Sequence, residues 1–341
     1  MTFIRYFLFA ALTPILIIAL IGFYLQPITG DLTRVGNVSE RSWGWNAPKA
    51  TISIKENDSS KPAQVLVIGD SFSIQNSWQS AAAEFSGNTF LTYHWNDIGG
   101  SHCLEVAVRD LVKSHPEVRY VVFELIERGF IGSFGEADKT LVACKPPIRT
   151  SVKGGASTIG GDRKHFEWSE LLADPIYSIK ALFNEKNKYD SLMSLDQAKA
   201  APLSRSDLFS NRRSDAILFL GNDLEKQTWT QTQIAQALSN IEKISLNLSN
   251  LGVVPIFVIV PDKLTTYAPF LANGVLRQDL PNAALDLSHG KVKSIYLNAL
   301  FQDKATHAVD FYLPNDTHLS SDGFIFLGQQ IGGYINNLKN R

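Results

Sequence analysis

The 341-residue chain has little of what several classes of site require. Only two cysteines are present, and neither belongs to a Cys-x-x-Cys motif or to a Cys/His cluster with zinc spacing, so we expect no structural metal site and no cofactor. The formal net charge is −1, which leaves no polybasic surface for nucleic acid. Internal repeats are also lacking. The length fits one large domain with an insertion, or two small domains.

The longest apolar run fills residues 3–25. Its roughly 20 residues are enough to cross the hydrocarbon core of a bilayer. Arg5 lies at the start of the run, so the positive-inside rule places the N-terminus in the cytoplasm and the rest of the chain in the periplasm. A cleaved signal peptide is the alternative, but the residues after Leu20 offer no small-x-small cleavage site. We expect residues 1–26 to be a retained, single-pass anchor in a bacterial inner membrane.

A short apolar stretch followed by a serine organises the rest of the chain. Residues 65–68 (Val-Leu-Val-Ile) are typical of a strand buried on both faces of a parallel sheet. Residues 69–71 (Gly-Asp-Ser) follow, and glycine with small polar residues favours a sharp turn into a helix. Open α/β folds bind ligands at the carboxyl edge of the sheet, so Ser71 is either a site residue or an ordinary helix N-cap.

Strand-like and helix-like segments alternate after this turn. Such alternation predicts a parallel sheet with right-handed crossovers, and we expect a flavodoxin-like three-layer α/β sandwich. Further strands are predicted at residues 89–95, 119–126, 253–260 and 294–297, with helices at residues 104–112 and from about residue 232 to residue 251.

Two stretches do not follow the alternation. Residues 27–62 carry Pro, Gly, Asn, Ser and Lys without periodicity, and we expect a linker that becomes irregular structure on the surface of a domain at residues 63–341. The interval at about residues 133–226 is too long for a loop between two strands. We interpret it as an insertion that either shapes a binding site or is a mere decoration.

A second polar cluster lies near the C-terminus. Asp316 and His318 stand two residues apart, before an apolar run that suits a final amphipathic helix. A serine nucleophile needs a base to take its proton, and the base needs an acceptor that fixes its tautomer. Ser71, His318 and Asp316 are therefore a candidate catalytic triad, and we expect Ser71 Oγ and the imidazole to lie about 2.6–3.2 Å apart. For the Asp-x-His pair alone, a solvated surface loop is the alternative.

Four short segments carry a family resemblance. The Gly-Asp-Ser and Asp-Thr-His segments resemble the first and last blocks of SGNH (GDSL-type) hydrolases. Residues 122–128 (Val-Phe-Glu-Leu-Ile-Glu-Arg) resemble the WE-x-x-ER strand end of periplasmic alginate O-acetyltransferases of the AlgJ/AlgX type, and residues 260–263 (Val-Pro-Asp-Lys) with Tyr267 resemble their PDK…Y segment. Leu319 stands where their DTHW motif has tryptophan, and the Asp-x-His element here follows the serine instead of preceding it. The resemblance spans roughly residues 63–335, apart from an unmatched middle.

An acyl-transfer site also needs donors for the oxyanion. We expect the backbone N–H of Ser71 to be one donor, and a backbone N–H of the Gly99-Gly100 turn, after the second predicted strand, to be another. SGNH hydrolases add an asparagine after the third strand, which this chain lacks, and Asn96 is the candidate substitute.

Three further residues are candidates for support of the site. Arg128 is expected to pair with Glu124 or Glu127 and to brace the site. Lys263 and Tyr267 match the resembling segment, but each could equally cap a helix or fill a groove.

A triad alone does not separate acyl transfer from hydrolysis, because both reactions pass through the same acyl-enzyme. The apolar N-terminal run and the alginate-type motifs favour transfer. The resemblance implies acetylation of an exopolysaccharide or another cell-envelope glycan, with the acetyl group supplied by an integral-membrane O-acyltransferase partner. Two alternatives stay open: an anchored SGNH esterase that removes acyl groups from glycans or lipids, and a non-catalytic assembly or glycan-binding subunit.

The two cysteines, Cys103 and Cys144, follow the second and third predicted strands. Parallel neighbours in a sheet could bring them close, and an oxidising compartment would let them pair. We expect a disulfide, which requires Cα atoms within roughly 4.4–6.8 Å. Two separate thiols in the core are the alternative.

Overall fold

The computed structural model describes residues 2–25, 30–46, 62–74, 77–135, 144, 146–147, 175–184, 189–272, 292–295 and 297–340. Residues 47–61 of the predicted linker and residues 148–174 of the predicted insertion lie outside the described residues.

A five-stranded parallel sheet with the order β2-β1-β3-β7-β8 forms the centre of the molecule. Counted within this sheet alone, the order is 2-1-3-4-5, which is the order of flavodoxin-like folds. The predicted α/β class and parallel sheet are therefore confirmed. The strands are β1 (Val65–Gly69), β2 (Phe90–His94), β3 (Tyr120–Ile126), β7 (Val254–Val260) and β8 (Ser294–Ile295).

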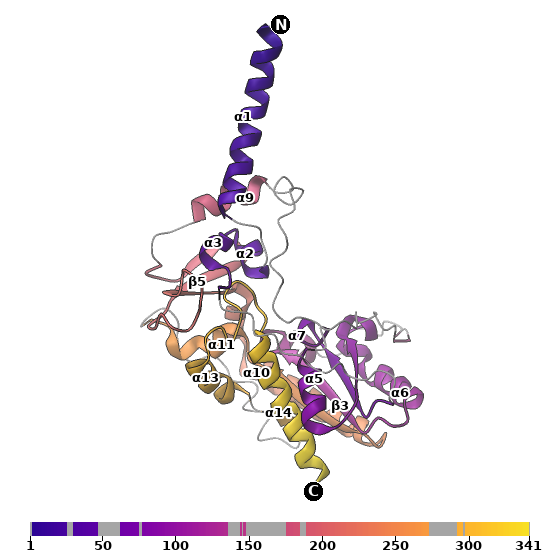
Figure 1. The fold of residues 1–341 in the computed structure, drawn as a ribbon. Helices are drawn as coiled ribbons and strands as arrows, with labels where there is room; N and C mark the ends of the chain where they lie inside the picture. Colours follow the sequence, from indigo (N-terminus) through magenta and orange to yellow (C-terminus); the bar gives the residue numbers. More distant parts are fainter. Residues whose placement is uncertain are drawn as a thin grey trace.

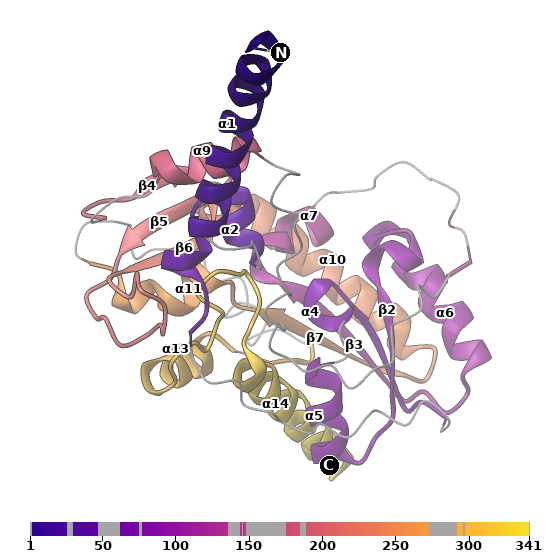
Figure 2. The ribbon, with the colours of Figure 1, turned by 45° about the horizontal axis from the view of Figure 1, so that its top comes forward.

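Helices cover both faces of this sheet because both faces of its strands are apolar (Figure 2). In β1, Val65 and Val67 point to one face, and Leu66 and Ile68 point to the other. The first face packs against α5 (Ser77–Ser86), α13 (Asn298–His307) and α14 (Ser321–Lys339). The second face packs against α6 (Leu104–Ser114), α7 (Phe130–Phe134) and α10 (Gln231–Ser249).

A second, antiparallel sheet comes from the predicted insertion. Its strands are β4 (Met193–Leu195), β5 (Ala198–Pro202) and β6 (Ala216–Leu220), in the order β4-β5-β6. It shares a core with α2 (Asp31–Gly36) and α3 (Glu40–Trp43), in which Leu32, Val38 and Trp43 are buried. Residues 30–46 thus differ from the expected linker: burial of these three apolar side chains folds the segment onto the domain.

The first helix, α1 (Thr2–Leu25), projects away from the rest of the molecule (Figure 1). The stretch Thr2–Ile21 is long and apolar enough to cross a membrane, although a signal sequence would meet the same criterion. The end of α1 lies against α9 (Pro175–Asn184), where Ile21 packs against Tyr177 and Ala181.

The predicted disulfide is confirmed. Cys103 and Cys144 are bonded, and their Cα atoms lie 5.5 Å apart, within the expected range. The bond joins the 3-10 helix η2 (Ser101–Cys103), after β2, to the chain that follows β3.

Candidate active site

The turn after β1 presents Ser71 at the carboxyl edge of the sheet. Ser71 is exposed and begins the short helix α4 (Ser71–Ile74). Asp70 fixes this turn with both carboxylate oxygens: Oδ1 accepts from the Phe72 N–H at 2.9 Å, and Oδ2 accepts from the Ile126 N–H at the end of β3 at 2.8 Å. The aspartate of the Gly-Asp-Ser motif therefore holds the nucleophile turn against the neighbouring strand.

A buried glutamate supports the same turn from within the molecule. Glu124 Oε2 accepts hydrogen bonds from the Asp70 N–H at 3.2 Å and from Ser73 Oγ at 2.6 Å. A Cβ on Gly69 would lie 2.1 Å from Ser73 Oγ and 2.7 Å from Glu124 Oε2, so the close approach requires glycine. Burial and the adjacent Asp70 charge raise the pKa of Glu124 well above its ordinary value.

The second half of the site is a loop at residues 313–318, which we call the catalytic loop. Pairing of Tyr312 with Leu319 closes it. Lys263 is buried beneath it, and its Nζ donates to the carbonyls of Leu313 at 2.7 Å, Pro314 at 2.9 Å and Asp316 at 3.2 Å. Lys263 therefore supports the catalytic loop by direct contact.

Tyr267 supports the same loop at its base. Its buried hydroxyl accepts a hydrogen bond from the Tyr312 N–H at 3.2 Å, and its ring packs edge-on against that of Tyr312.

The structure brings the three candidate triad residues together. His318 Nε2 lies 2.8 Å from Ser71 Oγ, and His318 Nδ1 lies 2.6 Å from Asp316 Oδ1. The Phe72 ring packs against the imidazole, with the ring centroids 5.0 Å apart. The first distance lies within the expected range, so the geometry is that of a nucleophile, its base and the acceptor that orients the base.

The electrostatics of the pair favour one tautomer. Burial acts to raise the pKa of Asp316, but the hydrogen bond and charge of His318 outweigh it and lower that pKa below its ordinary value. An ionised Asp316 accepts only, so the proton of the imidazole sits on Nδ1, and Nε2 is free to accept from Ser71. Burial acts to lower the pKa of His318, yet the bond to Asp316 and the charges of Asp316, Asp31 and Asp70 raise it overall.

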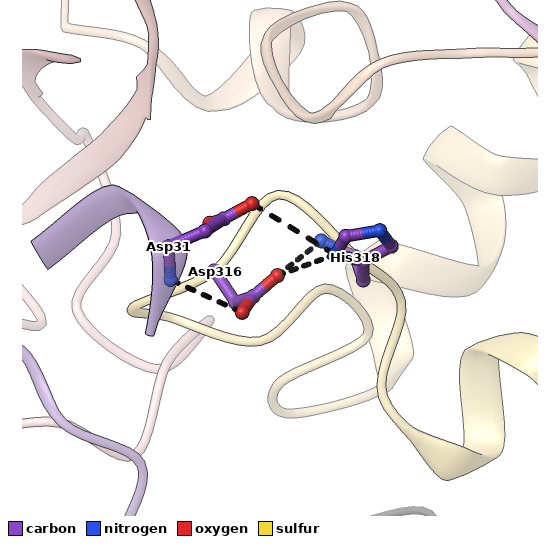
Figure 3. Close-up of side chains that lie close together, drawn as sticks. All are labelled: Asp31, Asp316 and His318. Atoms are coloured by element: carbon purple, nitrogen blue, oxygen red, sulfur yellow. Dashed lines mark hydrogen bonds and ion pairs between the residues drawn. The ribbon is translucent and has the colours of Figure 1, made fainter. Parts of the chain in front are cut away.

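A fourth residue, Asp31, joins the pair from α2, at the far end of the sequence (Figure 3). Its backbone N–H donates to Asp316 Oδ2 at 3.2 Å, and its Oδ2 lies 3.8 Å from His318 Nδ1. Burial and the Asp316 charge raise the pKa of Asp31. Sequence reasoning missed Asp31, because residues 27–62 carry no periodicity and nothing local marks a contact with residue 316.

Asp31, Asp316 and His318 also place three potential metal-ligand atoms within 4.8 Å of one another. In the present geometry His318 Nδ1 is engaged by Asp316 Oδ1 at 2.6 Å, which is a hydrogen-bond distance between two groups that a metal would have to separate. The arrangement fits proton transfer.

Two of the expected oxyanion donors are engaged elsewhere, which corrects that part of the prediction. The Gly99 N–H donates to the Asn96 carbonyl at 3.2 Å and the Gly100 N–H to the Trp95 carbonyl at 2.9 Å, because both residues end the 3-10 helix η1 (Trp95–Ile98). The Ser71 N–H, at the first position of α4, has no acceptor within its own helix and suits the role. A role for Asn96, exposed on η1, stays a prediction.

Arg128 does not pair as expected. Its Nη1 contacts Asp223 Oδ1 at 3.2 Å, whereas Glu127 is taken by Lys226 at 2.7 Å. Asp223 and Lys226 come from the 3-10 helix η4 (Gly221–Thr228), which lies at the end of the predicted insertion and the start of the strand-helix pattern that follows. The partner of Arg128, which follows the third strand of the sequence prediction, therefore comes from the insertion.

The comparison with known protein families agrees with the site. Residues 214–338 match the model of an SGNH hydrolase-like domain of acetyltransferase AlgX. The matched segment contains Lys263, Asp316 and His318, and the structure places Ser71, outside the match, against His318. No curated protein and no solved structure matches the chain. The predicted resemblance is confirmed over this segment: residues 214–338 are similar to the SGNH hydrolase-like domain of acetyltransferase AlgX.

Proposed function

We propose that this protein is a membrane-anchored periplasmic O-acetyltransferase, which moves an acetyl group through a Ser71 acyl-enzyme onto hydroxyls of an exopolysaccharide or another cell-envelope glycan. The observation that carries the proposal is the continuous chain of hydrogen bonds from Ser71 Oγ through His318 to Asp316. The similarity to the AlgX domain supports a transferase acting on a polysaccharide.

The chemistry follows from this geometry. Ser71 Oγ attacks the acetyl carbonyl carbon of a donor ester while its proton moves to His318 Nε2, and the Ser71 N–H faces the developing oxyanion. Collapse of the tetrahedral intermediate breaks the ester bond, and His318 returns the proton to the departing alcohol. A glycan hydroxyl then gives its proton to His318 and attacks the acetyl carbonyl carbon. The bond from that carbon to Ser71 Oγ breaks, and His318 returns the proton to Ser71 Oγ. The products are an acetylated glycan and free Ser71.

The position of the site supports a donor held at the membrane. Asp31, beside His318, follows Leu25 at the end of α1 by only six residues, which span at most about 20 Å. Packing of Ile21 against Tyr177 and Ala181 gives α1 a contact with the folded domain, which supports retention of this helix as an anchor. An integral-membrane O-acyltransferase that delivers the acetyl group would then find Ser71 close to the bilayer.

The experiment uses the full chain in detergent with an activated acetyl ester and a panel of uronate and neutral oligosaccharides. Mass spectrometry should find an acetyl group on Ser71, and adding the correct oligosaccharide should divert acetyl groups from water to the glycan. Exposure of Ser71 to solvent favours an esterase as the second candidate. Release of free acetate alone, with every glycan offered, would replace the transferase by that esterase, and failure to form any acetyl-enzyme would leave a non-catalytic subunit.

A further inference from the structure

We propose that Asp31 is a positioning residue for the Asp316–His318 pair, so that the segment directly after α1 is part of the catalytic machinery. We call residues 30–44, which contain α2 and α3, the N-terminal clamp. The inference rests on the proposed function, because the residues that it assigns serve the same acyl-transfer chemistry.

Among the described residues, the backbone N–H and the carboxylate of Asp31 form hydrogen bonds with the catalytic loop. Its N–H donates to Asp316 Oδ2, the oxygen that does not contact the imidazole. Its own carboxylate accepts from the Thr317 N–H at 2.8 Å and from the Thr317 hydroxyl. Asp316 and Thr317 are thereby held on both sides by one residue, which fixes the plane of the carboxylate that orients His318.

The rest of the clamp is shaped for this approach. The carbonyl of Asn315 accepts from the Leu32 N–H at 3.1 Å and from the Thr33 N–H at 3.4 Å. Buried Glu40 connects the N-terminal clamp to the catalytic loop, because it accepts from the Gly30 N–H at 2.7 Å and from Asn315 Nδ2 at 2.9 Å. A Cβ on Gly30 would lie 2.0 Å from the Asn315 carbonyl oxygen, so any other residue would push the clamp off the loop.

The Asp31 carboxylate also acts on the charge of the base. Its Oδ2 lies 3.8 Å from His318 Nδ1, the same nitrogen that Asp316 contacts at 2.6 Å. The groups that act on the imidazole are the carboxylates of Asp316, Asp31 and Asp70 and the ring of Phe72. A second negative charge at this distance stabilises the imidazolium that forms when the Ser71 proton arrives.

The test compares Asp31→Asn with wild type in the full-length protein in detergent. The amide keeps the size of the side chain and removes its charge. We expect kcat/KM for an activated acetyl ester to fall about 100-fold, mainly through kcat, because the amide keeps only one acceptor oxygen for the N–H and hydroxyl of Thr317 and removes the negative charge beside His318. The acid limb of the pH–rate profile should move to lower pH, because loss of a neighbouring carboxylate lowers the pKa of His318. Asp110→Asn, the same change on the exposed surface of α6, is the control and should leave both quantities unchanged.

Thr317→Val tests the contact between Thr317 and Asp31 without removing the Asp31 carboxylate. It removes the hydroxyl that donates to Asp31 and keeps both carboxylates, so we expect a loss of about fivefold to tenfold with no movement of the acid limb. This variant also carries the test if melting curves show that Asp31→Asn does not fold. A Thr317→Val enzyme with wild-type kcat would overturn the positioning role.

An NMR titration of the His318 imidazole makes the outcome independent of turnover. A lower imidazole pKa in Asp31→Asn than in wild type supports the inference even if wild type forms no acetyl-enzyme, in which case only the proposed function fails. Equal imidazole pKa values, together with kcat/KM within twofold of wild type wherever turnover is measurable, would overturn the inference.

Discussion

Two clusters of ionisable residues lie along the same carboxyl edge of the sheet and differ in their access to solvent. In the first, the catalytic cluster, the side chains of Asp31, Asp316 and His318 are 18–28% exposed and adjoin the exposed Ser71. In the second, which we call the buried ion cluster, four of five side chains are at most 1% exposed. The buried ion cluster consists of Glu127, Arg128, Asp223, Lys226 and Asp262.

On the proposed function, similar residue types at one sheet edge serve two purposes. Lys226 contacts both Glu127 and Asp262, so the charges of the buried ion cluster compensate one another. Breaking such a set is costly because one charge is left buried without a partner. In the catalytic cluster, two carboxylates converge on one imidazole nitrogen and leave the other nitrogen to a nucleophile. Substitutions should therefore separate activity from stability.

The largest effect is expected for Ser71→Ala. Acyl transfer should fall by at least about 10⁴-fold, because removal of a triad member leaves only binding and oxyanion contacts. The melting temperature should stay near that of wild type, since the hydroxyl is exposed and fills no core volume. Esterase turnover and a thermal melt measure both quantities, and Ser114→Ala at the end of α6 is the matched control. Retained acetylation in Ser71→Ala would show that another residue is the nucleophile.

Lys226→Met tests the opposite cluster. We expect the free energy of unfolding to fall by about 3–5 kcal/mol, because the carboxylates of Glu127 and Asp262 lose their shared cation inside the protein. Denaturant titration gives the loss, and kcat per folded molecule at low temperature should stay near wild type. Lys180→Met, which removes an exposed ion pair to Asp196, should change stability by less than about 1 kcal/mol. A stable but inactive Lys226→Met enzyme would show that the buried ion cluster serves activity and not stability, contrary to this prediction.

Features that depend on a few adjacent residues could be predicted from the sequence. The strands β1, β3 and β7 are mostly apolar runs, so their places could be read from the sequence, and the helical segments between them predicted parallel pairing. Ser71 and His318 could be found because each sits in a short motif beside a predicted strand or helix. Convergence of their two loops then follows from the common edge of a parallel sheet.

Features that depend on distant partners could not be predicted. Asp31 and Asp316 are 285 residues apart, and no local pattern records that α2 lies on the catalytic loop. Arg128 finds Asp223 95 residues away, because burial of η4 brings an acid closer than the two neighbouring glutamates. The Gly99 and Gly100 N–H groups were expected to be oxyanion donors because they follow the second strand. Both instead donate to carbonyls of η1, which depends on the positive φ angles that glycine readily adopts.

Lys263 shares a property with each cluster. It is buried like the buried ion cluster, and it contacts the catalytic loop like the catalytic cluster. Replacement by Met keeps much of its volume but removes the hydrogen bonds to Leu313, Pro314 and Asp316. We expect kcat to fall about 100-fold through misplacement of the Asp316–His318 pair. Stability should fall by about 2 kcal/mol, because the carbonyls of the catalytic loop lose their buried donor.

The matched control for Lys263→Met is Lys199→Met, whose ammonium group donates to the exposed Ser194. Steady-state kinetics and a denaturant titration measure the two effects. Loss of stability without loss of kcat would show that Lys263, like the buried ion cluster, stabilises the fold and does not position the catalytic loop.

The smallest effect on activity is expected for Asp223, whose charge depends on pH. Burial, aided by the charge of Asp262, raises the pKa of Asp223 from its ordinary 3.8 to about 7. Between these two values the folded protein keeps a proton that the unfolded chain has released. The stabilising contribution of this proton is complete below about pH 4 and is lost as the pH rises to about 7, with a slope of at most about 1.4 kcal/mol per pH unit.

Asp223→Asn should remove this part of the pH dependence, because an amide does not titrate. Glu124 and Glu127 also have pKa values raised by burial, so the relevant quantity is the difference in slope between wild type and variant, measured by denaturant titrations from pH 4 to pH 8. The acid limb of the activity profile should stay in place, since that limb reports His318. Equal slopes would mean that Arg128 holds Asp223 ionised throughout this range, and the buried ion cluster would then be a fixed set of charges with no proton to exchange.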